Sequence, residues 1–255
     1  MTDDIRVEAD GGVLTVTFNR PQQRNAMTWA MYEELERACE RADADDAIRI
    51  MVLRGAGDKA FVAGTDIRQF AGFRTGEDGI DYGHRIVSVL TRLQNVGVPT
   101  IAAIDGYCVG GGLGIAACTD IRIATPAARF GVPIARTLGN CLSGAALTLL
   151  THQLGQPRTT SLLLTARMMD AEEALGCGFV TELTTDLDTA TAALTERLLS
   201  HAPLSMWASK EAIRRLRRAT RFDDADIVTC VYGSDDFHNA VAAFGDKRRA
   251  TWTGR

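Results

Sequence analysis

The stretch PTIAAIDGYCVGGGLGIAACTD, residues Pro99–Asp120, decides the fold. It begins with a β-branched run, Thr100–Ile104, that ends at the turn signal Asp105-Gly106. A glycine cluster and a run of small residues follow, and they predict a short helix before a third strand at Asp120–Ala124. Strands and helices that alternate in this way are typical of an α/β protein.

Two junctions between a strand and a helix expose backbone amides through small residues, at Ala60–Ile67 and at Gly106–Gly112. The first amides of a helix are unpaired donors at the positive end of the helix dipole, so they suit an oxygen that gains negative charge. Two such donors can form an oxyanion hole. For a single glycine-rich turn, a tight chain reversal stays the alternative. Neither junction has a lysine-bearing phosphate loop or a GxGxxG pattern, which weakens a nucleotide-binding hypothesis.

Outside this centre, the pattern predicts a hairpin over Ile5–Phe18 that turns at Asp10-Gly11-Gly12. A helix capped by Thr28 should run to about Ala44, a strand should occupy Ile48–Leu53, and a helix should occupy Tyr82–Val96. The glycines of Arg74–Gly83 predict a mobile loop.

After about Asp186 the strand signals stop, and three helical stretches follow. They are Leu187–Leu199, Pro203–Leu216 and Asp223–Arg249, the last with a break at Gly233. Their apolar faces must be covered, either by the core of the same chain or by another subunit. The sequence leaves both alternatives open.

Composition narrows the functional class. The chain has 255 residues, 46% hydrophobic and 24% charged, which fits one large globular domain or one domain with an appendage. The net charge of -4 favours neither nucleic acid nor an anionic membrane, and no apolar stretch approaches the roughly 18 residues of a membrane span. Six scattered cysteines lack metal-ligand spacing, so we expect reduced thiols, no metal and a cytoplasmic location.

Several blocks of sequence resemble one known family. They are Asn19–Met27, Ala60–Ile67, Pro99–Asp120, Ala128–Gly131 and, at the tail, Asp236–Arg248. In this order, the blocks are similar to those of the enoyl-CoA hydratase/isomerase, or crotonase, superfamily. The resemblance covers nearly the whole chain.

The resemblance implies an α/β fold, with a crotonase-like ββα spiral core over residues 1–195 and a helical C-terminal segment over residues 196–255. That segment would serve trimerisation and CoA contacts, in a homotrimer or a dimer of trimers. The implied ligand is an acyl-CoA thioester of fatty acid metabolism, with no cofactor beyond the CoA moiety of the substrate.

By the same resemblance, the backbone amides of Thr65 and Gly111 hold the thioester oxygen and stabilise an enolate. A threonine is unusual at the first position, but the donor there is main chain. The positions that correspond to the family's CoA contacts are Ala26, Ala63, Asp66, Ile67, Arg68, Phe244 and Lys247. For Arg68 and Lys247 a solvated cation is the alternative to a contact with the 3′-phosphate.

The family pattern fails at two positions. Hydratases of the family use two glutamates that position a water and move its protons, and this chain has Gly114 and Ile134 there. Neither side chain can carry a proton, so hydration by the two-glutamate route is disfavoured. The family also performs dehalogenation, decarboxylation, ring closure and C–C cleavage on the same enolate, with functional groups elsewhere in the pocket.

Other candidate groups follow Ile134. Cys141 could be a nucleophile or acid, Asn140 a hydrogen-bond donor and Arg136 a carboxylate binder. A buried structural thiol is the alternative for Cys141, and a cap of the next helix is the alternative for Asn140. His84 and Tyr107 are weaker candidates, and Asp66 fits a turn-fixing role better than proton abstraction.

Two hypotheses remain. In the first, the chain is an acyl-CoA lyase or isomerase of this superfamily whose enolate reacts without the two glutamates. In the second, it is a catalytically inactive acyl-CoA-binding or subunit-interaction homologue. RNA binding gains no support from the acidic net charge.

Overall fold

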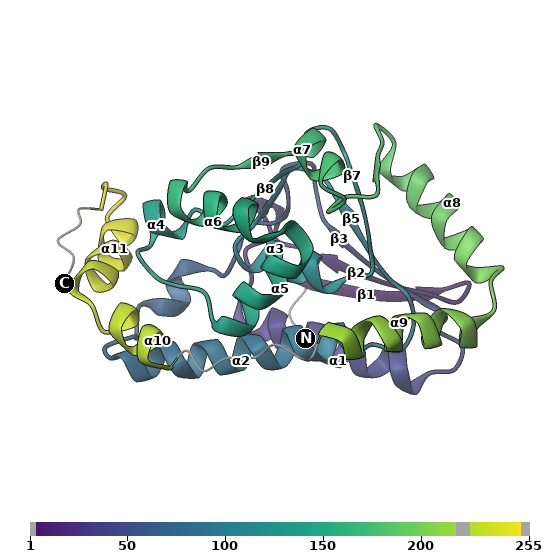
Figure 1. Ribbon diagram of the computed structural model, residues 1–255, viewed down its shortest axis with the longest axis horizontal. Coiled ribbons are helices and arrows are strands. Elements are labelled where there is room, and N and C mark those ends of the chain that lie inside the picture. Colours follow the sequence, from purple (N-terminus) through teal and green to yellow (C-terminus); the bar gives the residue numbers. More distant parts are fainter. Residues whose placement is uncertain (1–3, 218–224, 251–255) are drawn as a thin grey trace.

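A computed structural model describes residues 4–217 and 225–250 of the chain (Figure 1). The predicted N-terminal hairpin is confirmed: β1 (Ile5–Asp10) pairs antiparallel with β2 (Val13–Phe18). Gly11 and Gly12 make the turn at φ angles of 54° and 85°, a region that glycine enters without steric cost.

The described strands form two sheets. The larger has the order β1-β2-β3-β5-β7-β10, and every neighbouring pair after β1-β2 is parallel. Its remaining strands are β3 (Ile50–Gly55), β5 (Thr100–Ile104), β7 (Ile121–Ala124) and β10 (Glu182–Leu183). The smaller sheet consists of β4 (Ala60–Val62), β6 (Tyr107–Val109), β8 (Arg129–Gly131) and the antiparallel β9 (Met169–Asp170).

Helices connect these strands and cover them. The connections between strands include α1 (Trp29–Ala44), α2 (Gly76–Gln94) and α3 (Gly111–Cys118), with the 3₁₀ turns η1 (Pro21–Gln23) and η2 (Ile67–Phe70). Beyond β8 lie α4 (Ile134–Thr137), α5 (Gly144–Leu154), α6 (Gln156–Thr165) and α7 (Ala171–Gly176). The C-terminal helices are α8 (Leu187–Leu199), α9 (Pro203–Arg217), α10 (Ala225–Tyr232) and α11 (Asp235–Gly245). The mixed α/β fold class predicted from the sequence is confirmed.

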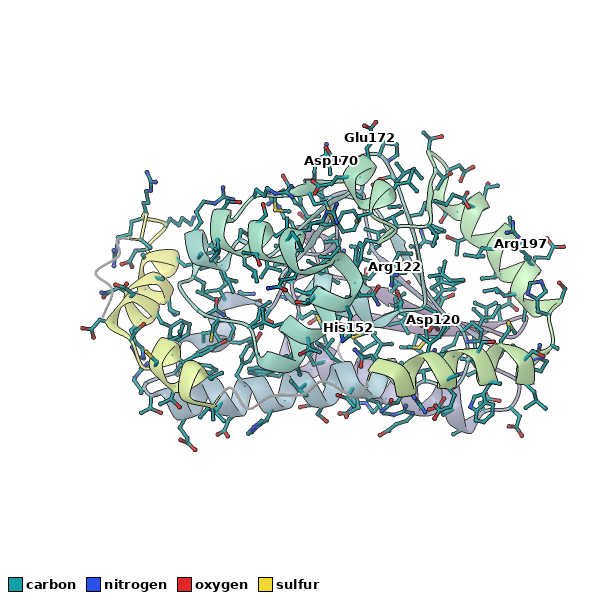
Figure 2. All side chains as sticks on the ribbon, viewed as in Figure 1. Asp120, Arg122, His152, Asp170, Glu172 and Arg197 are labelled. Carbon is teal, nitrogen blue, oxygen red and sulfur yellow. The ribbon has the colours of Figure 1, made fainter. Side chains whose placement is uncertain are left out.

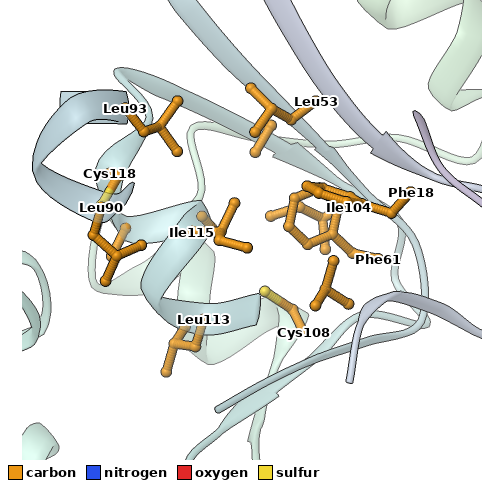
Figure 3. Packing of buried hydrophobic residues seen from close by; sticks show 14 of the residues in the cluster. Phe18, Leu53, Phe61, Leu90, Leu93, Ile104, Cys108, Leu113, Ile115 and Cys118 are labelled. Atoms are coloured by element: carbon orange, nitrogen blue, oxygen red, sulfur yellow. The ribbon is translucent and has the colours of Figure 1, made fainter. Parts of the chain in front are cut away.

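The central strands bury both faces, as parallel strands between helices do. Along β3, Met51 and Leu53 face the main core, whereas Ile50 and Val52 face a second apolar cluster that α8 covers. Helix α3 lies inside the main core, where Leu113 and Ile115 pack near Cys108 and Ile104 (Figure 3). The glycine-rich start of α3 is therefore held on a rigid support.

One prediction is wrong: the stretch Arg74–Gly83 is not a loop. Helix α2 begins at Gly76, six residues before the predicted start, behind a capping box formed by Thr75 and Asp78. A β-carbon at Gly79 would lie 2.1 Å from the ring of Tyr232 on α10. Gly76 and Gly79 are needed because α10 packs against α2 at short range, so this part of the C-terminal segment folds back on its own chain.

Few charged groups lie inside the molecule. Arg122 is buried and donates to the carbonyl oxygens of Thr119 (2.6 Å) and Phe179. Figure 2 places Arg122 and Asp120 in the middle of the molecule, with Arg197 and Glu172 at its edges. Among the described residues, no helix is both long and apolar enough to cross a membrane.

Candidate functional site

A cavity of about 140 Å³ opens where the two predicted junctions meet helices α2, α4, α5 and α10. Most of its wall is apolar. Both junctions contribute backbone to it, Gly64 and Thr65 from the first and Gly110 and Gly111 from the second. The structure therefore brings together two segments that lie far apart in the sequence.

The first junction follows β4 and is held by backbone hydrogen bonds to the segment before α1. The amide of Met27 donates to the Gly64 carbonyl oxygen (2.8 Å), and the amide of Asp66 donates to the Met27 carbonyl oxygen (2.8 Å). Gly64 adopts a φ of 104°, which a residue with a side chain rarely adopts. These bonds fix the direction of the chain at Thr65.

Asp66 stabilises this junction. Its carboxylate accepts from the amide of Arg68 (3.2 Å), from the Arg68 guanidinium (2.6 Å) and from Arg20 (3.2 Å). The hydrogen bonds from Arg68 are the main reason that the pKa of Asp66 lies below its usual value. The predicted turn-fixing role of Asp66 is confirmed.

The second junction is the start of α3. Gly110 has a φ of 55°, and its amide donates to the Gly131 carbonyl oxygen (2.9 Å). Gly111 is the first residue of the helix, where amides have no partner within the helix. A β-carbon at Gly111 would lie 3.7 Å from the Thr65 nitrogen, so the two backbone segments approach each other closely at the cavity.

Three hydroxyl groups form a chain beside these amides. Thr65 Oγ1 lies 2.8 Å from Tyr32 Oη and 3.0 Å from Tyr82 Oη. Tyr32 comes from α1 and is fully buried, whereas Tyr82 comes from α2 and lines the cavity. Burial is the largest cause that raises the pKa of both tyrosines, so both remain neutral.

The two positions that the resemblance assigns to the hydratase glutamates lie at the cavity. Gly114 and Ile134 both line it. Among the described lining residues there is no carboxylate, histidine or lysine, and the titratable side chains are Tyr82, Cys141 and Tyr232. These described lining residues therefore offer no pair of carboxylates for proton transfer.

Asn140 and Tyr232 lie in the same wall. The Asn140 side-chain nitrogen donates to Tyr232 Oη (3.2 Å), and the buried amide oxygen of Asn140 has no hydrogen-bond partner among the described residues. Asn140 does not cap the next helix, because Ser143 does so by accepting from the Ala146 amide (3.3 Å). Cys141 lines the cavity and is half-buried.

An aromatic cluster from four elements forms the wall beside Tyr82. It consists of Phe70, Phe73, Tyr82, Tyr232 and Phe237. The rings of Tyr82 and Tyr232 are 6.0 Å apart, and those of Tyr232 and Phe237 are 4.8 Å apart. Of these rings, Phe70, Tyr82 and Tyr232 line the cavity, whereas Phe73 and Phe237 pack against them from outside the lining, so α10 contributes to the wall and α11 supports it.

The other predicted residues are spread more widely. Ala63 and Ile67 line the cavity, and the Ala26 carbonyl oxygen accepts from Arg20 (2.5 Å) behind the first junction. Phe244 and Lys247 are exposed at the end of α11. Three weak candidates are exposed and outside the cavity lining: His84, Tyr107 and Arg136.

Sequence reasoning missed the tyrosines. The chain has four, and it considered only the exposed Tyr107, whereas the other three surround the cavity. The signal that could have found them was a tyrosine on an otherwise apolar face, because a buried hydroxyl group needs a hydrogen-bond partner.

Known proteins match this chain over its whole length. The sequence profile described as enoyl-CoA hydratase/isomerase matches residues 8–255. The chain is 32% identical to the short-chain-enoyl-CoA hydratase of Clostridium acetobutylicum, over 97% of this chain and 96% of the relative. It is 33% identical to a probable enoyl-CoA hydratase of Rhizobium meliloti, over 99% of both chains. A solved enoyl-CoA hydratase/carnithine racemase from Magnetospirillum magneticum aligns with a TM-score of 0.82 and 34% identity, covering 100% of this chain and 97% of that one. The chain belongs to the enoyl-CoA hydratase/isomerase family.

Proposed function

We propose that this protein is an enzyme that binds an acyl-CoA thioester and holds the thioester oxygen between the backbone amides of Thr65 and Gly111. The observation that carries the proposal is the meeting of these two junctions at one end of a largely apolar cavity. Fixed amides in a cavity with little water stabilise an enolate oxygen more than they stabilise the neutral carbonyl. The family membership and the names of the relatives support the same ligand class.

The reaction we propose does not use two carboxylates. Gly114 and Ile134 supply no proton, and the polar groups at hand are hydroxyls, one amide and one thiol. The enzyme would act as a lyase or isomerase by another route from the same enolate. Asn140 and Cys141 are the candidates for contact with the reacting carbons, because both line the cavity.

The second candidate is an inactive homologue that binds acyl-CoA or another subunit. The loss of both carboxylates favours it. Helix α9 adds exposed apolar side chains at Leu204, Trp207 and Ile213, which are suited to burial against another copy in a trimer or a dimer of trimers. Arg68 and Lys247 would serve CoA phosphates in either case.

Calorimetry with acetyl-CoA and butyryl-CoA tests both candidates. We expect CoA thioesters to bind and the free acids not to bind. A protein that binds none of these thioesters would contradict both proposals. Crotonyl-CoA hydration should be very slow, and turnover of about 10 per second or more would show that another group replaces the glutamates.

The variant Gly111→Pro tests the role of the Gly111 amide without disrupting helix α3. Proline is well tolerated at the first position of a helix, so it deletes the donor without breaking α3. Because a β-carbon at this position would approach Tyr32 Oη, the substitution is made in the Tyr32→Phe background, and Tyr32→Phe alone is the control. We expect any acyl-CoA activity of the control to be lost in the double variant. Activity that persists in a folded double variant would disprove the proposed hole.

A further inference from the structure

The hydroxyl chain at the cavity holds one hydrogen more than it can use internally. Tyr32, Thr65 and Tyr82 carry three hydroxyl hydrogens, and two contacts of 2.8 and 3.0 Å join their oxygens. Each contact uses one hydrogen, so one O–H remains to bond outside the chain.

Burial decides where that hydrogen lies. Tyr32 is 1% exposed, and its hydroxyl group lies within hydrogen-bonding distance of Thr65 Oγ1. A buried O–H without an acceptor is unfavourable, so Tyr32 donates to Thr65. Thr65 can then donate to Tyr82 Oη at 3.0 Å, which leaves the hydrogen of Tyr82 for the cavity.

From this geometry we propose that the Tyr82 hydroxyl is a third hydrogen-bond donor to the acyl oxygen of the bound thioester, beside the amides of Thr65 and Gly111. The inference rests on the proposed acyl-CoA site and extends it to a side chain of α2. The order Tyr32 to Thr65 to Tyr82 to ligand uses every hydroxyl hydrogen. Each donor in such a chain polarises the next, which strengthens the last bond.

This assignment also gives the threonine a role. Its backbone amide would serve the hole whatever its side chain, but its hydroxyl connects two tyrosines from different helices. Burial raises the pKa of Tyr82, so this group stays a neutral donor and does not become a base.

The test uses acetyl-CoA labelled with ¹³C at the carbonyl carbon, followed by infrared difference spectroscopy. Hydrogen bonds to a carbonyl oxygen lower its stretching frequency, so the band of bound acetyl-CoA should lie below that of the free thioester. In Tyr82→Phe we expect part of this shift to be lost. Tyr107→Phe, which removes an exposed hydroxyl group outside the cavity lining, is the control and should keep the wild-type band.

Affinity gives a second measurement. One lost hydrogen bond should weaken acetyl-CoA binding by about three- to tenfold in Tyr82→Phe. S-ethyl-CoA, a thioether without the acyl oxygen, should bind Tyr82→Phe and wild type equally. A general loss of packing would weaken both ligands.

The outcomes separate this inference from the function on which it rests. If wild type binds acetyl-CoA with an unshifted band, or binds neither acetyl-CoA nor butyryl-CoA, the proposed hole is wrong. If wild type shows the shift and Tyr82→Phe keeps all of it, the hole stands and the role of Tyr82 is disproved. Should Tyr82→Phe fail to fold, Thr65→Val keeps the amide and breaks the chain. It should lose the smaller part of the shift that polarisation through the chain supplies, and a wild-type band in that variant would overturn the inferred order from Tyr32 through Thr65 to Tyr82.

Discussion

A β-carbon at Gly111 would lie 2.7 Å from the hydroxyl oxygen of Tyr32, closer than real β-carbons come to other atoms. Tyr32 belongs to α1 and Gly111 begins α3, so this contact joins two helices at the candidate site. The residue at position 111 is therefore a glycine for lack of space beside a buried hydroxyl, in addition to any role of its amide.

Gly111→Ala should lower the free energy of unfolding by about 1–3 kcal/mol, because the new methyl group overpacks a site closed by a buried side chain. Tyr32→Phe removes the obstructing oxygen, so the double variant should recover stability relative to the sum of the two single changes. Urea unfolding of the four proteins measures this coupling. Strict additivity would show that the two residues do not meet.

Gly79→Ala should destabilise the packing of α10 on α2, since the new methyl group would overlap the ring of Tyr232. We expect a loss of about 1–3 kcal/mol and faster amide exchange across Ala225–Tyr232. Gly83→Ala on the same helix is the control, because nothing lies within 4 Å of a β-carbon there. That change should be neutral or stabilising by up to about 1 kcal/mol. Equal effects of the two substitutions would contradict the packing argument.

Introducing carboxylates at Gly114 and Ile134 should increase crotonyl-CoA hydration. A β-carbon at Gly114 would meet only the flexible end of Leu90 at 3.4 Å, so a side chain can begin at this position without a clash with backbone. Gly114→Glu with Ile134→Glu should raise crotonyl-CoA hydration at least about tenfold over the parent, as general acid–base catalysis contributes more than that when well placed. The glutamine pair at the same positions controls for size and polarity. If it matches the glutamate pair, proton transfer is not the missing element.

Glu173 should contribute to stability in a defined pH range. It accepts from Arg167 (2.7 Å) and Arg158 (3.0 Å), and these hydrogen bonds, chiefly those from Arg167, lower its pKa from 4.5 to about 2. A lowered folded-state pKa adds stability that is fully present above pH 4.5 and is lost as the pH falls towards 2.

Glu173→Gln should therefore flatten the loss of stability between those two pH values, as followed by urea unfolding. The matched control is Glu172→Gln, an exposed neighbour on α7, which should keep the wild-type acid dependence. A Glu173→Gln curve parallel to that of wild type would show that the two arginines do not hold this carboxylate.

Local signals predicted much of the fold. The alternation of Ile5–Phe18, the cap at Thr28 and the helix Leu187–Leu199 were all found as expected, because each depends on side chains that are close in sequence. The stretch Arg74–Gly83 was misinterpreted as a loop because two of its glycines, Gly76 and Gly79, are required by the packing of helix α10, which lies far away in the sequence. Glycine permits a turn and also permits close packing, and only the partner distinguishes the two.

The site was predictable in its backbone but not in its side chains. The small residues at Ala60–Ile67 and Gly106–Gly112 predicted exposed backbone amides, and the structure places both junctions at one cavity. The chain of Tyr32, Thr65 and Tyr82 could not be foreseen, since its members come from three separate elements with no common spacing.

The aromatic wall of the cavity also has a consequence for biosynthesis. Phe70, Phe73 and Tyr82 are synthesised well before their partners Tyr232 and Phe237, because a long stretch of chain separates the two groups. Until then, the nascent chain carries an apolar pocket with one side open. The pocket closes only after the chain through Phe237 has been synthesised, so a chain terminated before Tyr232 would present an exposed apolar surface to chaperones and proteases.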